Sequence, residues 1–331
     1  MDKQTLFELF KENGKRKDST SNAYATRISG LAKKFQATDQ LFLQDYESIF
    51  NSISTNATST QANCLSSIIE YLTILNEHTL VDEYKKRKEL LDNKIDKEYQ
   101  KNPISKNQQE NMITYEELLK YCDMIDKEVS IYEAKPMPSL NDEWILKDLK
   151  NIKILLRLYL LHPTRNEYCS LQFIPFREYK KIKEPEFNYI VLPAATGKRK
   201  PFLSITNYKT QDKYGLKITE LQDKPLVKIL RDLHKQIGNT YLFKLSKTGE
   251  PWQSHNLCSI MTKYSRKLID KNISSTILYK IVIKEAGYNF EEALKNDDFI
   301  QAEKFNEILQ KYAKTRGHSR KIQDMAYIAN N

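Results

Sequence analysis

The spacing of apolar residues constrains the fold of this chain most strongly, because it is helical on both sides of one short block of β-type runs. Stretches such as "SNAYATRISGLAKKFQ" and "STILYKIVIKEAG" repeat their apolar residues at helical intervals. Between residues 187 and 221 the pattern changes to the runs "FNYIVLP", "KPFLSI" and "YGLKITEL". Only 8 Gly and 10 Pro interrupt the 331 residues. The sequence therefore predicts a mainly α-helical protein with a small, three-stranded antiparallel β-sheet.

A polar segment divides the chain into two expected domains. The stretch "KNPISKNQQENM", residues 101–112, contains a proline and lacks an apolar stripe, which predicts a linker. It separates a helical domain, 1–100, from a second domain, 113–331. Just after it, Thr114 followed by Glu117 forms the pattern of a capping box, so we expect a helix to begin there. A later apolar helix, "WILKDLKNIKILLRLYLLHP", is expected to end at Pro163.

The charge balance favours a polyanionic partner. The chain has 53 Lys and Arg against 43 Asp and Glu, a formal charge of +10. Such an excess favours nucleic acid first and an anionic membrane surface second, although a basic protein without either partner has the same composition. The four cysteines form no C-x-x-C pair, so neither a zinc ribbon nor a disulfide framework is expected. We expect these cysteines to be reduced and packed, as in an intracellular protein. No secretory signal is expected, because the first residues lack an apolar h-region, and no transmembrane helix is expected, because there is no run of 18 apolar residues.

Four residues form a set suited to phosphoryl transfer without a metal. Arg165 follows an apolar helix, Lys209 lies in a turn between two β-type runs, and His318 and Tyr327 stand nine residues apart near the end of the sequence. A tyrosine hydroxyl attacks a phosphodiester and forms a covalent link. An arginine neutralises the non-bridging oxygens. A lysine protonates the leaving 5′ oxygen, and a histidine assists proton transfer.

Each of these residues taken alone has an ordinary structural explanation. Arg165 could complement the C-terminal dipole of a helix. Lys209 could be a solvated charge in a turn, and His318 could simply follow the glycine that ends a helix. Tyr327 is one of 20 tyrosines and by itself most resembles a packing residue. The hypothesis therefore depends on their joint order and context.

Five segments together resemble the tyrosine recombinases, or phage-integrase family, and most resemble the integrases of large DNA viruses and their mobile elements. They are "STSNAYATRISGLAKKF", "PTRNEYCSLQF", "NYKTQDKYG", "SSTILYKIVI" and "RGHSRKIQDMAY". The resemblance implies a two-domain DNA clamp, in which a helical core-binding domain precedes an α+β catalytic domain. It implies that Arg165, Lys209, His318 and Tyr327 are catalytic and that Glu167 supports Arg165. It also implies a covalent 3′-phosphotyrosine intermediate and no metal or other cofactor.

One position departs from the family pattern. The family's second box is His-x-x-Arg, and its arginine completes the phosphate clamp; here the window begins at Thr276, and Tyr279 stands where the arginine is expected. A phenol offers no cationic fork. Lys280 points about 100° away on the same helix. Arg316 and Arg320, which flank His318, are candidates to replace the missing charge.

The resemblance implies double-stranded DNA as the partner, with further copies of the chain assembling on it as a tetramer, and no membrane. The expected location is intracellular, wherever the DNA lies: nucleus, viral factory or cytoplasm of a host. Two alternatives stay open. Tyr279 favours a degenerate recombinase that binds DNA and cuts it weakly or not at all. A type IB topoisomerase would share the same chemistry while relaxing supercoils without a partner site.

Overall fold

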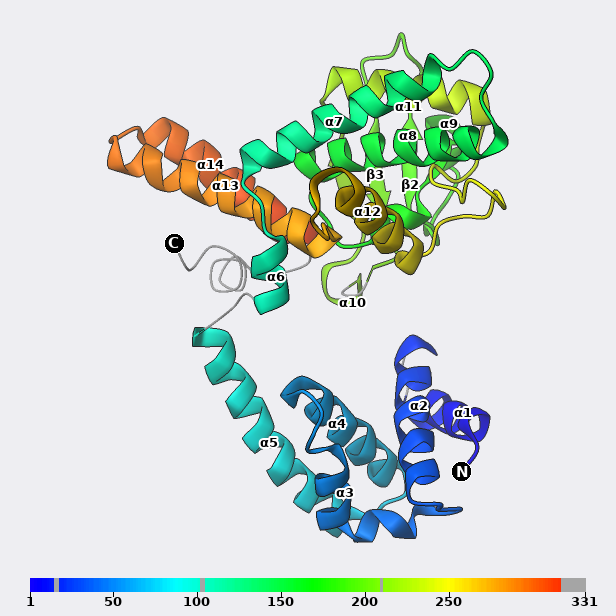
Figure 1. The fold of residues 1–331 in the computed structure, drawn as a ribbon, viewed down its shortest axis with the longest axis vertical. Coiled ribbons are helices and arrows are strands. Elements are labelled where there is room, and N and C mark those ends of the chain that lie inside the picture. The colour runs from blue at the N-terminus through cyan, green and yellow to red at the C-terminus, as the bar shows by residue number, and fades with distance from the viewer. Residues whose placement is uncertain (15–17, 102–104, 209–210, 317–331) are drawn as a thin grey trace. The chain divides into compact units, whose positions relative to one another are not determined.

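The chain folds as two units that each have their own hydrophobic core. This computed structural model describes residues 1–14, 18–101, 105–208 and 211–316. The division lies between Met1–Pro103 and Ile104–Asn331. In Figure 1 the described residues of the first unit are coloured from blue to cyan and those of the second from cyan to red.

The first unit is entirely helical in its described residues. Large apolar side chains on its helices, among them Phe10, Ile28 and Tyr84, are fully buried, and the Tyr84 hydroxyl donates to the Leu43 carbonyl at 2.9 Å. The described elements are α1 (Lys3–Gly14), α2 (Asp18–Lys34), the 3-10 helix η1 (Gln40–Gln44), α3 (Tyr46–Ile53), α4 (Thr58–Ile74) and α5 (His78–Lys101).

The segment expected as a linker, residues 101–112, is partly helical. Helix α6 (Lys106–Asn111) begins at Ser105, whose side chain accepts a hydrogen bond from the Gln108 amide. Residues of the second unit bind this helix: Lys271 Nζ donates to the Glu110 carbonyl at 2.8 Å, and the Asn272 amide donates to Asn111 Oδ1 at 2.6 Å. Polar contacts therefore hold α6 to the rest of the second unit. Because these contacts do not require apolar side chains, the sequence of α6 shows no apolar stripe.

The second unit combines nine α-helices within the described residues with one small sheet. Helix α7 begins with the expected capping box, in which Thr114 and Glu117 exchange hydrogen bonds. The α-helices are α6, α7 (Tyr115–Glu133), α8 (Leu140–Leu161), α9 (Phe176–Tyr179), α10 (Gln211–Tyr214), α11 (Lys224–Ile237), α12 (Ser254–Ile269), α13 (Ser275–Lys295) and α14 (Phe299–Arg316). A 3-10 helix, η2 (Glu167–Ser170), follows α8.

In the described residues the sheet has four strands and is mixed, which corrects the predicted three-stranded antiparallel sheet. Strands β2 (Tyr189–Leu192), β3 (Phe202–Ile205) and β4 (Lys217–Glu220) are antiparallel and lie in the three predicted runs. The missed strand is β1 (Gln172–Pro175), which pairs with β2 in parallel at the edge of the sheet. Its four residues are too few to show alternation, and parallel pairing leaves no turn signal between the strands.

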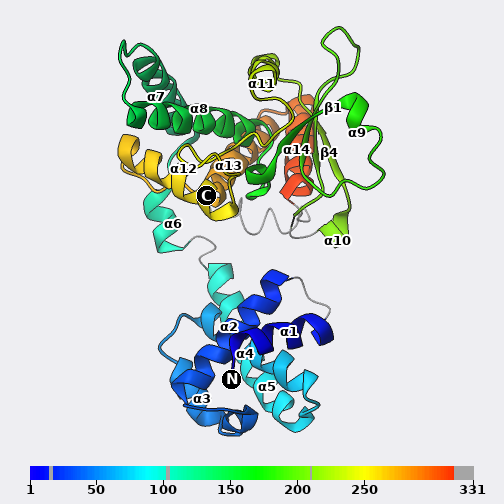
Figure 2. The same cartoon turned by 90° about the vertical axis from the view of Figure 1, so that its right-hand side faces the viewer.

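The two faces of the sheet pack against different partners. Phe173 and Ile190 belong to the main core, which the sheet shares with α7, α8, α12 and α13. Ile174, Tyr189 and Val191 pack on the other face against aromatic side chains of α9 and its flanks. Figure 2 shows α9 on one side of the sheet and α13 and α14 on the other. The expectation of a mainly helical chain with one small sheet is confirmed.

None of the helices in the described ranges combines the length and apolar composition needed to cross a bilayer.

Candidate active site

Arg165 lies in the turn between α8 and η2, and hydrogen bonds fix the backbone of this turn. The Tyr159 hydroxyl and the Thr164 hydroxyl both donate to the Arg165 carbonyl, the latter at 3.1 Å. The Tyr168 hydroxyl donates to the carbonyl of His162, the residue that caps α8. Because Pro163 cannot continue the helix, the chain leaves α8 here. Arg165 therefore projects from a turn that two buried tyrosines hold in place.

Glu167 begins η2 and is 8% exposed. Its Oε2 atom is buried and accepts no hydrogen bond from any residue in the described part of the chain. The side chain of Asn188 ties this region to the end of β3: its Nδ2 donates to the Glu167 carbonyl at 3.1 Å, and its Oδ1 accepts from the amides of Thr206 and Asn207 at 3.0 and 2.8 Å. Asn188 thus fixes the chain just before the β3–β4 connection against the segment that carries Arg165.

Lys217, which the sequence did not single out, is buried beside this segment. It is the first residue of β4 and is 8% exposed. Its ammonium lies 3.5 Å from the centre of the Tyr208 ring and donates to the Thr315 carbonyl at 2.9 Å. Burial lowers the pKa of Lys217 to about 8; the Glu167 charge opposes this shift, and the Arg165 charge adds to it. The three charged groups therefore lie close enough to interact.

Arg316, the last residue of α14, joins α13 to the Arg165 turn. It is 4% exposed, and its Nη1 donates to the Thr164 carbonyl at 2.7 Å. Its Nη2 lies 3.5 Å from Thr276 Oγ1, and its guanidinium carbon lies 4.0 Å from the centre of the Tyr279 ring. Thr276 and Tyr279 are three residues apart on α13 and so share a face of the helix. The two residues of the second box thus meet one arginine beside Arg165.

Lys280 adds another buried positive charge. It is 4% exposed, and its ammonium donates to Gln108 Oε1 on α6 at 2.8 Å. Burial lowers the pKa of Lys280, and the charge of Arg316 lowers it further. From the sequence we predicted only that Lys280 points away from Tyr279. Its burial could have been predicted from its position within the apolar stretch "LYKIVI".

Counted over the described residues, positive charge is in excess among the buried side chains of the second unit. We call Arg165, Glu167, Lys217, Lys280 and Arg316 the cationic cluster. Among the described residues of this unit, the buried charged side chains are Lys217, Lys280 and Arg316 against Glu167 and Asp148. Asp148 is engaged elsewhere, by Ser246, Tyr264 and Lys263. Because burying unbalanced charge is costly, the cluster is suited to an anionic ligand.

The remaining predicted site residues, Lys209, His318 and Tyr327, lie outside the described residues. Arg165 and Glu167 are members of the cationic cluster, and Thr276 and Tyr279 contact its Arg316. Within the described ranges, no group of three or more His, Cys, Asp or Glu side chains is arranged to hold a metal ion.

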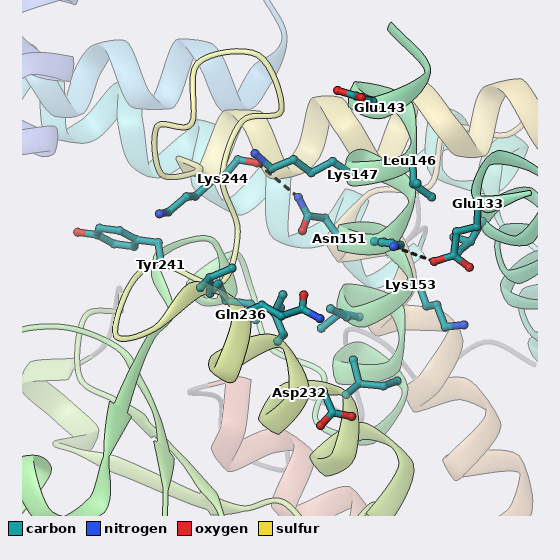
Figure 3. Close-up of a pocket in the computed structure, with 17 residues that line it drawn as sticks. Glu133, Glu143, Leu146, Lys147, Asn151, Lys153, Asp232, Gln236, Tyr241 and Lys244 are labelled. Carbon is teal, nitrogen blue, oxygen red and sulfur yellow. Dashed lines mark hydrogen bonds and ion pairs between the residues drawn. The ribbon is translucent and has the colours of Figure 1, made fainter. Parts of the chain in front are cut away.

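The second unit also contains a cavity of about 710 Å³, whose lining side chains are drawn in Figure 3. Side chains of α7, α8 and α11 and of residues 241–244 line it, and several of the lining residues are charged. Lys150 bridges to Glu133 at 2.7 Å, and Asn151 Nδ2 lies 3.4 Å from the Lys244 carbonyl. No predicted site residue and no residue of the cationic cluster lines it, so we do not assign the proposed chemistry to this cavity.

Comparison with known proteins finds a structural likeness. The chain matches no family model and no curated protein. Its structure is similar to a crystal structure of XerA recombinase, with 12% sequence identity and a TM-score of 0.40, over 99% of this chain and 94% of the other.

Proposed function

We propose that the chain is a site-specific DNA recombinase that cuts and rejoins strands through Tyr327. The observation that carries this proposal is the buried excess of positive charge around Arg165. A phosphodiester carries one negative charge and gains more in the transition state of its cleavage. Preorganised cations in a site shielded from water stabilise that charge more strongly than water does.

The chemical step balances with protein groups and DNA alone. The Tyr327 oxygen bonds to phosphorus and loses its proton, and the bond from phosphorus to the 5′ oxygen breaks. The departing oxygen takes a proton, for which Lys209 is the proposed donor, and His318 assists the transfer. Arg165 holds the non-bridging oxygens, and Glu167 supports it. Attack by a 5′ hydroxyl on the phosphotyrosine reverses the step and rejoins the strand.

Duplex DNA is the proposed partner, and further copies of the chain assembled on it as a tetramer would exchange strands between two sites. The distribution of charge supports a DNA partner for the second unit. Residues 1–103 contain 15 Lys and Arg and 15 Asp and Glu, so the whole formal excess of +10 belongs to residues 104–331. Phosphate contacts from this unit would supply most of the affinity. An intracellular location, where such DNA is found, belongs to the same proposal.

The test is a covalent adduct on DNA. We would incubate the full chain with a library of duplexes that have a randomised centre and a bridging 5′-sulfur at the phosphodiester, because a thiolate leaving group needs no acid and does not readily rejoin. We expect a protein–DNA adduct that survives denaturant and maps to a peptide containing Tyr327. Tyr327→Phe should abolish it. Tyr288→Phe, which changes an exposed tyrosine, should not. The proposal would be refuted if the parent protein formed no adduct, or if the adduct persisted in Tyr327→Phe.

One observation favours a second candidate, a recombinase-like protein that binds DNA without cutting it. Tyr279 is completely buried at the position where the family pattern has an arginine. Removal of one such group lowers the rate by about 10²–10³-fold. This candidate predicts that the parent retains the library duplexes on a filter, forms no adduct, and gains adduct formation in Tyr279→Arg.

A further inference from the structure

We propose that Arg316 supplies the second guanidinium of the phosphate site, and that Tyr279 is the platform that holds it there. This inference rests on the proposed phosphate site. The family pattern places the second arginine on α13, at the position of Tyr279. We assign this role to Arg316 at the end of α14, and Tyr279 then positions the Arg316 guanidinium.

The position of Arg316 next to Arg165 is the first argument. Its Nη1 binds the carbonyl of Thr164, the residue directly before Arg165, at 2.7 Å. A guanidinium presents its N–H donors in a planar fork that matches the oxygens of a phosphate, and the Nη1 and Nη2 atoms of Arg316 contact Thr164 and Thr276. The two arginines come from segments 151 residues apart in the sequence, yet they meet at one turn.

The stacking geometry is the second argument. The guanidinium carbon of Arg316 lies 4.0 Å from the centre of the Tyr279 ring, well within the range of a cation–π contact. The ring itself is fully buried and packs with Ile283 and Leu309 in a small core between α13 and α14. An arginine at position 279 would place a second guanidinium where this ring now attracts the first. The tyrosine and Arg316 are therefore matched to each other.

Charge is the third argument. Arg316 is almost completely buried, and its charge lowers the pKa of Lys280, another buried cation. The contacts of Arg316 with a carbonyl, a hydroxyl and an aromatic face orient the guanidinium. Lys217 brings a further positive charge to the same region. An oxyanion bound between these cations would offset the cost of burying them together.

The first experiment measures anion binding without any cleavage. We would record the thermal midpoint of the full chain with inorganic phosphate at pH 7, against sodium chloride of the same ionic strength. We expect phosphate to raise the midpoint of the parent and to raise that of Arg316→Gln distinctly less. Arg199→Gln is the matched control, because Arg199 also stacks on a ring, that of Phe176 at 4.6 Å, but is exposed. Equal phosphate shifts in the parent and Arg316→Gln would overturn the inference.

The second experiment moves the guanidinium to the other helix. On the sulfur-bridged duplexes, Arg316→Gln should lower the rate of adduct formation by about 10²–10³-fold. Arg316→Lys, which keeps the charge without the fork, should lower it less. Tyr279→Arg alone should also lower the rate, because two guanidiniums then compete for one place. The exchange of both residues, Tyr279→Arg with Arg316→Tyr, should recover part of the activity.

The outcomes separate this inference from the proposed function. If the parent forms an adduct but Arg316→Gln forms it equally fast, the inference is wrong and the recombinase proposal stands. A faster Tyr279→Arg variant would likewise refute the inference, since it would show that the clamp lacks a cation. If the parent forms no adduct, the recombinase proposal fails, and the phosphate-dependent midpoints alone decide whether Arg316 belongs to an anion site.

Discussion

His162 shows how one buried side chain can make the stability of the second unit depend on pH. It ends α8 next to Pro163 and is almost fully buried. Burial lowers the pKa of His162 from 6.5 to about 4; the charge of Lys311 adds to this shift, and Asp223 opposes it. The folded state therefore prefers the neutral imidazole. Because the unfolded chain takes up the proton at a higher pH, the stabilising effect is complete above pH 6.5 and declines as the pH falls towards 4.

We predict that His162→Asn removes this dependence. The free energy of unfolding of the parent should fall relative to that of the variant by up to about 3 kcal/mol as the pH falls from above 6.5 to about 4. Urea denaturation at several pH values measures the difference. His255→Gln, a change of an exposed histidine, serves as the control and should run parallel to the parent. A difference between parent and His162→Asn that is constant with pH would show that the imidazole is not held neutral.

The residues around the cluster show what the sequence could and could not predict. Arg165 could be placed because Pro163 marks the helix end before it. Lys217 could not, because alternation along β4 would bury Leu216 and Ile218 and expose Lys217, whereas Ile218 is 52% exposed and Lys217 is buried. The reversal follows from tertiary contacts with Tyr208 and Thr315, which no local pattern encodes. Under our proposal, Lys217 contributes positive charge to the phosphate site, which explains why a lysine occupies the buried face of β4.

At the scale of elements, local hydrogen-bonding signals predicted boundaries well. The capping box at Thr114 lies where the sequence indicated, since its donors and acceptors are all within four residues. Strand β1 and helix α6 were missed, because a parallel strand pair and a helix held by Lys271 and Asn272 depend on residues far away in the sequence. Short elements whose partners are distant are thus the part of this fold that periodicity cannot reveal.

Substitutions at the N-terminal caps of α7 and α4 should change stability in opposite directions. Thr114→Ala removes the hydroxyl that accepts from the Glu117 amide at 3.1 Å, and we expect it to lower the stability of the second unit by about 1 kcal/mol. Thr114→Ser keeps the hydroxyl and should lower the stability much less.

Helix α4 begins after Ala57, which makes no side-chain cap. Ala57→Ser should therefore raise the stability of the first unit by about 0.5–1 kcal/mol. Denaturant unfolding monitored by amide hydrogen exchange measures the stability of each unit separately. Unchanged stability of the second unit in Thr114→Ala and of the first unit in Ala57→Ser would mean that these caps do not limit helix stability.

At the scale of the whole molecule, the two units differ in charge although both are rich in lysine. Many lysines of the first unit lie beside acids on the same helix, as Lys85 does with Asp82 at 4.0 Å and Lys88 with Asp92. In the second unit, α12 exposes Lys263, Arg266 and Lys267, although Lys263 also lies 3.5 Å from Asp148 and Lys267 lies 3.9 Å from Glu128. Its first turn is bonded to the Arg165 segment through Asn166 and Ser254. A DNA backbone that reached the cationic cluster would therefore have a basic helix beside it.

Under the proposed function, this arrangement predicts where the salt dependence of DNA binding would arise. Removing one phosphate contact should make the slope of log affinity against log salt shallower by about 0.9. We expect Arg266→Gln to change the slope by about that amount, because the exposed guanidinium of Arg266 lies on α12 and donates to the neutral Asn272 side chain at 3.0 Å. Lys85→Gln, which removes an exposed charge from the balanced first unit, should leave the slope unchanged. Fluorescence anisotropy of a labelled duplex between about 50 and 200 mM salt measures both slopes. A larger change in Lys85→Gln than in Arg266→Gln would place the DNA contacts on the first unit and refute this assignment.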